Sequence, residues 1–140
     1  MYEKVCLDEL SNLPQLLIAN FLYTLLYHVF KQKIMKRNIS EAPERWVILK
    51  LPNNYYKVFG TWAGGYLDGD RWKLNSGIKK VEQEDDYYYF IGFSGSCYKC
   101  HKMGYGTSTS YGLGILNKII EQGNGRVELM EDCENWSNVV

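Results

Sequence analysis

The stretch RWVILKLPNNYYKVFGTW, residues 45–62, decides the class of fold. Its first part, RWVILKL (45–51), is a short apolar run rich in β-branched residues, and its last part, YYKVFGTW (55–62), alternates around aromatic side chains. Both patterns are typical of β-strands. The residues between them, PNN (52–54), are typical of a turn. We therefore predict a β-hairpin at this point of the chain.

The chain after this hairpin continues with further strand patterns. RWKLNSGIKKVEQ (71–83) predicts a strand interrupted at Ser76-Gly77, and YYYFIGFSGSCYKCHK (87–102) predicts the longest strand. The acidic residues EDD (84–86) lie between them and predict the turn of a second hairpin. RVELM (126–130) predicts a last strand.

A short helix is predicted between the strands, beginning at Ser110 as the capping residue and ending at Gly123. Leu113, Leu116, Ile119 and Ile120 share one face of this helix.

Before the hairpin, NLPQLLIANFLYTLLYHVFKQKIMKR (12–37) predicts an apolar helix without charge from Leu16 to Phe30. Its polar residues Asn20, Thr24, His28 and Gln32 recur every four positions and form one narrow stripe. Three interpretations stay open. In the first, the helix packs on the sheet. In the second, it contacts a membrane through residues 13–30. In the third, residues 1–34 precede the natural start of the protein, because Met35 is followed by a polar segment that leads into the first strand.

These elements together predict an α+β fold. It consists of an N-terminal apolar helix over 1–34, a twisted antiparallel sheet of about five strands and one short C-terminal helix. Residues 35–140 are expected to form a single α+β domain, with residues 35–44 as the only linker.

Composition limits the classes of partner. The chain has 140 residues, and its 16 basic and 16 acidic residues cancel, so it carries no global signal for nucleic acid.

The start of the chain lacks the basic region of a secretory signal peptide, so we expect reduced cysteines and a cytoplasmic location. With a membrane-associated helix, residues 35–140 would lie in the cytoplasm. A homo-oligomer is compatible with this composition.

The motif CYKCH (97–101) matches C-x-x-C-H, the pattern that attaches a c-type haem. In a regular strand, Cys97 and His101 would face one side and Cys100 the other, which cannot hold one haem. A zinc site needs two more ligands, and a thioredoxin-like redox site needs a helix after the motif. We therefore expect no cofactor and no metal, and keep a redox, zinc or haem protein using these three residues as the alternative.

The segment GTWAGGYLDGDRWKLNSGI (60–78) combines glycine with tryptophan, aspartate and arginine. Tryptophan faces stack on rings, and Asp and Arg make charge-assisted hydrogen bonds, so this composition is typical of a recognition loop. Together with the end of the strand over 98–102, it predicts these ligand-binding residues: Trp62, Tyr66, Asp68, Asp70, Arg71, Trp72, Asn75, Tyr98 and His101.

No catalytic residue is assigned, because only two histidines are present and neither has a nucleophile beside it in a bonding arrangement. The sequence thus predicts a small non-enzymatic binding protein whose loop recognises a small molecule, a nucleotide or a host protein. A membrane-tethered accessory protein is a further alternative.

GGYLDGDRWKLNSGI (64–78) and GSCYKCHKMGYGTS (95–108) resemble segments of a group of small uncharacterised proteins of phage and bacterial genomes. The resemblance extends over about residues 46–116 and does not include residues 1–34. It implies no activity. It does imply a mobile-element protein that binds a host component or a small molecule.

Overall fold

The computed structural model describes residues 17–29 and 37–140. The chain divides into two compact units between Arg37 and Asn38. We describe each unit by itself.

The first unit contains a helix over 17–29, which confirms the predicted helix for these residues; the rest of the predicted range, apart from Arg37, lies outside the described residues. Every residue of this helix is exposed. Within the polar stripe, the Thr24 hydroxyl donates to the carbonyl oxygen of Asn20 at 2.8 Å. In the described part of the chain, no helix has the length and apolar character needed to cross a membrane.

The second unit is built on a four-stranded antiparallel sheet in the order β3-β2-β1-β7. Strands β1 (Arg45–Leu51) and β2 (Tyr55–Trp62) form the predicted hairpin around the 3-10 turn η1 (Pro52–Asn54), and every residue of β1 pairs with a residue of β2. Strand β3 (Arg71–Leu74) pairs with β2, and β7 (Glu128–Leu129) pairs with β1.

A second, three-stranded antiparallel sheet contains β4 (Ile78–Glu84), β5 (Tyr87–Gly92) and β6 (Cys97–His101). The acidic turn between β4 and β5 is confirmed. Seven strands in two sheets replace the expected single sheet of about five, because two predicted strands each divide in two. The divisions fall at Gly77 (φ 118°) and Gly95 (φ 86°), in conformations that favour glycine and turn the chain.

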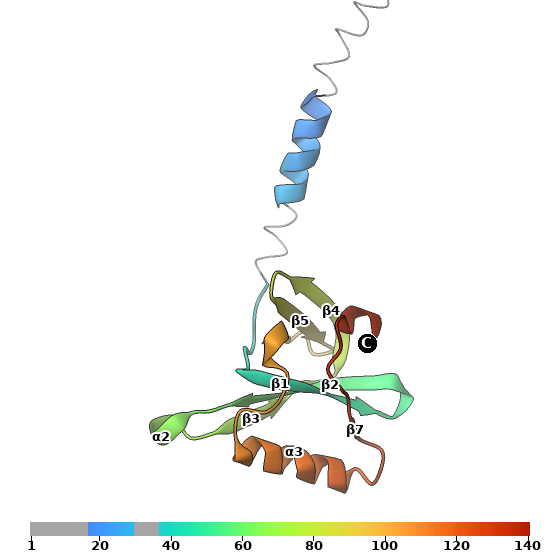
Figure 1. Cartoon of the computed structure of the whole chain (residues 1–140). Coiled ribbons are helices and arrows are strands. Elements are labelled where there is room, and N and C mark those ends of the chain that lie inside the picture. Colours follow the sequence, from blue (N-terminus) through green and yellow to red (C-terminus); the bar gives the residue numbers. More distant parts are fainter. Residues whose placement is uncertain (1–16, 30–36) are drawn as a thin grey trace, which may run out of the picture. The chain divides into compact units, whose positions relative to one another are not determined.

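The second unit consists of three layers (Figure 1). Helix α3 (Ser110–Gln122) covers one face of the four-stranded sheet, and the three-stranded sheet covers the other. The capping residue is Thr109, whose hydroxyl accepts from the Gly112 N–H, and not the predicted Ser110. Leu113 is 46% exposed, so it does not share the buried face with Leu116. The short elements are α2 (Gly65–Asp68), η2 (Lys102–Gly104) and η3 (Trp136–Asn138).

Two hydrophobic clusters explain why RWVILKL is apolar at successive positions. Trp46 and Ile48 belong to the cluster between the two sheets, whereas Val47 and Leu49 belong to the cluster under α3. A strand covered on both faces needs apolar residues in both directions. Trp136 closes the cluster between the sheets from the C-terminal end and is fully buried there.

Residues 40 and 41, in the segment expected to be a linker, pair with the three-stranded sheet. The N–H groups of Ser40 and Glu41 donate to the Cys97 carbonyl oxygen at 2.9 and 3.3 Å, and the Lys99 N–H donates to the Glu41 carbonyl oxygen at 2.9 Å. Residues 40 and 41 therefore extend the edge of the three-stranded sheet in the parallel direction beside Tyr98.

Candidate functional site

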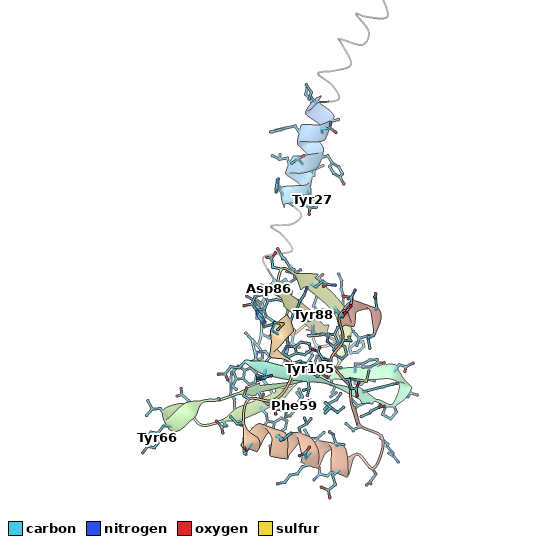
Figure 2. The ribbon with its side chains drawn as sticks, in the orientation of Figure 1. Tyr27, Phe59, Tyr66, Asp86, Tyr88 and Tyr105 are labelled. Carbon is cyan, nitrogen blue, oxygen red and sulfur yellow. The ribbon has the colours of Figure 1, made fainter. Side chains whose placement is uncertain are left out.

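The ends of β2 and β3 extend into an arm, which we define as residues 62–71, with α2 at its tip (Figure 1). Glycines make this tight turn feasible: a Cβ on Gly64 would lie 1.6 Å from the Gly69 carbonyl oxygen, and Gly69 itself has φ 70°. Figure 2 shows Tyr66 at the far end of the arm. Tyr66 is 102% exposed and Leu67 is 91% exposed.

An open pocket of ≈ 480 Å³ lies directly under the tip, which we call the arm pocket. The Arg71 guanidinium lies over the Trp62 ring, 4.1 Å from its centroid, in a cation–π contact. The Trp62 indole N–H donates to the Ala42 carbonyl oxygen at 3.0 Å, which fixes the ring. The pocket is lined by Glu44, Trp62, Ala63, Gly64, Asp68, Gly69 and Arg71.

The charges of the arm are mostly acidic. Arg71 lies 3.6 Å from the carboxylate of Glu41, so its charge is partly offset outside the arm pocket. Glu44 accepts the Ala63 N–H at 3.0 Å, and Asp68 and Asp70 form no ion pair with any residue that the structure describes. The tip therefore presents two apolar side chains next to unpaired carboxylates.

The predicted ligand-binding residues divide between several places. Trp62, Asp68 and Arg71 meet in the arm pocket, whereas Trp72 packs on Phe59 at 5.6 Å from ring centroid to ring centroid, on the α3 side of the sheet. Asp70 is exposed on the arm beside this pocket. The structure thus does not bring Trp72 into the arm pocket.

Asn75 and Tyr98 line a separate pocket of ≈ 210 Å³ at the point where the chain passes from β3 to β4. We call it the serine pocket, because Ser40, Ser76, Ser94 and Ser96 line it with them. Glu41, Lys73 and Leu74 complete the lining. The Lys73 ammonium forms an ion pair with Glu41, so Glu41 lies between Lys73 in this pocket and Arg71 in the arm pocket.

The two cysteines of the C-x-x-C-H motif lie on opposite faces of β6. Cys100 is fully buried in the cluster between the sheets with Tyr98, and Cys97 is three positions away along the same strand and faces the opposite side. Burial raises the pKa of the Cys100 thiol well above its usual range, and the neighbouring Cys97 raises it further. A raised pKa disfavours the thiolate that ligation and exchange need.

His101 packs edge-on against Tyr87, with 5.0 Å between the ring centroids, and its Nδ1 accepts the Met103 N–H at 3.0 Å. Within residues 17–29 and 37–140, no group of three or more His, Cys, Asp and Glu side chains is arranged to hold a metal ion. Cys6 lies outside the described residues.

Glu41, Glu44 and Lys73 take part in these sites but are missed by sequence reasoning. The two glutamates stand in the segment predicted to be a linker, and Lys73 is one cation among many. The pair Ser94 and Ser96 around Gly95 is visible in the sequence, but only as turn chemistry.

No family model matches this chain, and no curated protein or solved structure is significantly similar to it.

Proposed function

We propose that this chain is a non-enzymatic interaction protein that binds a protein partner through the tip of its arm. The observation that carries the proposal is the exposure of Tyr66 and Leu67, adjacent large apolar side chains at 102% and 91%. Neither contributes to the core of its own chain. Aromatic side chains that become buried at the centre of an interface supply much of the binding energy of protein complexes.

The charges of the arm define the chemistry of the partner. Asp68 follows the apolar pair directly, Asp70 stands two positions further, and Glu44 adds a third carboxylate in the arm pocket. A complementary surface has an apolar cavity for Tyr66 and Leu67 with Lys or Arg side chains at its rim. We propose that this surface belongs to a host component in the cytoplasm, as the resemblance to mobile-element proteins implies.

Site-specific photo-cross-linking tests the proposal. A photoreactive phenylalanine derivative replaces Tyr66 in the full chain, which is expressed in the cells that produce it. The matched control places the same group at Tyr111, which is 51% exposed on α3. We expect one dominant protein adduct from position 66 that position 111 does not give, and in which the attached partner peptide is flanked by basic residues.

Two results would contradict this proposal. Equal adducts from both positions would mean that the tip is no more than an ordinary exposed surface. An adduct with a second copy of the chain from position 66 would mean that the arm forms a homo-oligomer contact.

A second candidate function, a membrane-tethered accessory protein, is favoured by the helix over 17–29. Nine of its large apolar side chains are between 49% and 74% exposed, around most of the helix outside the polar stripe: Leu17, Ile18, Phe21, Leu22, Tyr23, Leu25, Leu26, Tyr27 and Val29. A helix whose apolar face is this wide requires a covering surface. Flotation with lipid vesicles tests contact through residues 13–30: the full chain should float and residues 35–140 should not.

A further inference from the structure

The side-chain amide of Asn75 has an unused donor group next to the serine pocket. Asn75 is 4% exposed, and its Oδ1 accepts the N–H of Val58 at 2.8 Å and the N–H of Gly77 at 3.3 Å. A reversed amide would place its NH₂ group against these two donors, so the orientation is fixed. Its Nδ2 is buried without a partner in the described part of the chain. Buried polar groups are almost always bonded, so this group leaves one donor of the fold unsatisfied.

Further unused donors line the same pocket. No hydrogen bond of the Tyr98 hydroxyl is found among the described residues, although Tyr98 is only 3% exposed. Burial and then the charge of Glu41 raise the pKa of Tyr98 to about 12, so its hydroxyl stays a donor at neutral pH. The Ser76 hydroxyl accepts the Ser94 N–H at 3.1 Å and keeps its own proton to donate.

The serine pocket is lined by one cation and one anion, Lys73 and Glu41, whose charges offset each other. Its carboxylate, that of Glu41, is already bound by Lys73 and lies 3.6 Å from Arg71. The unused groups named above are donors, and a carboxylate offers acceptors only. The unused groups of the pocket therefore match a carboxylate.

We propose that the serine pocket binds the carboxylate group of a small organic acid, with Asn75 Nδ2, the Tyr98 hydroxyl and the Ser76 hydroxyl as donors. The volume of ≈ 210 Å³ is below the roughly 300–1,000 Å³ of pockets for drug-sized ligands, so the acid is small. This site is separate from the arm tip, and its failure would leave the proposed protein partner untouched.

Nuclear magnetic resonance of the ¹⁵N-labelled full chain tests the site, with sodium acetate as the probe and sodium chloride at equal ionic strength as the reference. Acetate should shift the side-chain NH₂ signals of Asn75 and the backbone amide of Ser76 to saturation. Asn75→Asp keeps an oxygen for the Val58 and Gly77 N–H groups but replaces the donor by a charged acceptor. In this variant the backbone amide signal of Ser76 should therefore not respond to acetate.

Tyr98→Phe removes one hydroxyl and should weaken acetate binding about tenfold, the usual effect of losing a hydrogen bond to a charged group. Its matched control is Tyr56→Phe, the same replacement in the same core cluster but outside the pocket, which should bind like the wild type. If Asn75→Asp fails to fold, the comparison of Tyr98→Phe with Tyr56→Phe decides alone.

Three results would overturn the proposal. They are the absence of an acetate-specific, saturable shift at Asn75, an equal response to glycerol, and unchanged acetate binding in Tyr98→Phe.

Discussion

Gly77 connects the two sheets at the scale of a single residue. Glycine adopts its φ of 118° readily, whereas residues with a side chain rarely do. A Cβ at this position would lie 2.1 Å from the Tyr55 hydroxyl oxygen. The backbone can therefore leave β3 and enter β4 in another sheet within three residues. The same turn holds the Asn75 amide against the backbone of Val58 and Gly77, which leaves its Nδ2 turned away from both.

The ionisation of Tyr98 gives a prediction about pH. Because burial and Glu41 raise its pKa from about 10 to about 12, the folded state holds its proton more tightly than the unfolded state. Its contribution to stability is therefore complete below pH 10 and is lost as the pH rises towards 12. Chemical denaturation at several pH values should show a smaller loss of unfolding free energy over this range in Tyr98→Phe than in the wild type.

The control for this measurement is Tyr111→Phe, which changes a half-exposed side chain of α3. Tyr105, whose pKa burial also raises to about 12, remains in both variants and accounts for part of the alkaline loss. An equally steep loss in Tyr98→Phe and in the wild type would contradict the assignment.

At the scale of elements, the hairpin of β1 and β2 is predictable because its turn residues and its strand patterns agree. The assignment of strands to sheets is not. Residues 71–83 and 87–102 keep strand periodicity across a break, and local pattern contains no information on which sheet each half joins. For α3, the pattern gave the helix, but its buried face also includes Ile115 and leaves out Leu113, because packing on Phe59 and Leu49 sets its rotation.

Two glycines of α3 give a matched pair of predictions. A Cβ on Gly114 would meet nothing within 4 Å, so Gly114→Ala should stabilise the protein by about 0.5–1 kcal/mol, the usual difference between alanine and glycine in a helix. A Cβ on Gly112 would lie 2.8 Å from the Thr61 Cγ2, so Gly112→Ala should lose this gain or destabilise the protein. Thermal melting of both variants checks the difference; equal shifts in Tm would contradict the close contact of α3 with β2.

In the molecule as a whole, residues 60–78 were predicted to act together, but the structure divides them between the arm pocket, the α3 side of the sheet and the serine pocket. Trp62, Asp68 and Arg71 stay together because a hairpin keeps neighbours in the chain close. Asn75 joins Tyr98 only through the contact between two sheets, and Glu41 reaches both sites only because residues 40 and 41 pair with β6. These placements depend on tertiary contacts that no local pattern encodes.

The division into two units predicts that residues 35–140 fold alone. Both hydrophobic clusters, as far as the structure describes them, are formed by residues from Trp46 onward. The truncated chain should melt cooperatively, with a Tm within about 4 °C of the full chain, a shift that corresponds to roughly 1 kcal/mol or less. Circular dichroism checks this. Loss of the transition, or aggregation of the truncated chain only, would show that residues 1–34 cover part of the second unit.

Under the proposed function, Tyr66 and Leu67 serve binding and not folding, and one double variant tests both roles. In the full chain, Tyr66→Ala combined with Leu67→Ala should leave Tm unchanged, because both side chains are exposed. Affinity for the purified protein that cross-links to position 66 should fall at least about thirtyfold, as for the loss of a binding hot spot of about 2 kcal/mol. Titration calorimetry measures it. An unchanged affinity would rule out the tip as the binding site, and a Tm lowered as far as a core substitution lowers it would show that these side chains serve folding.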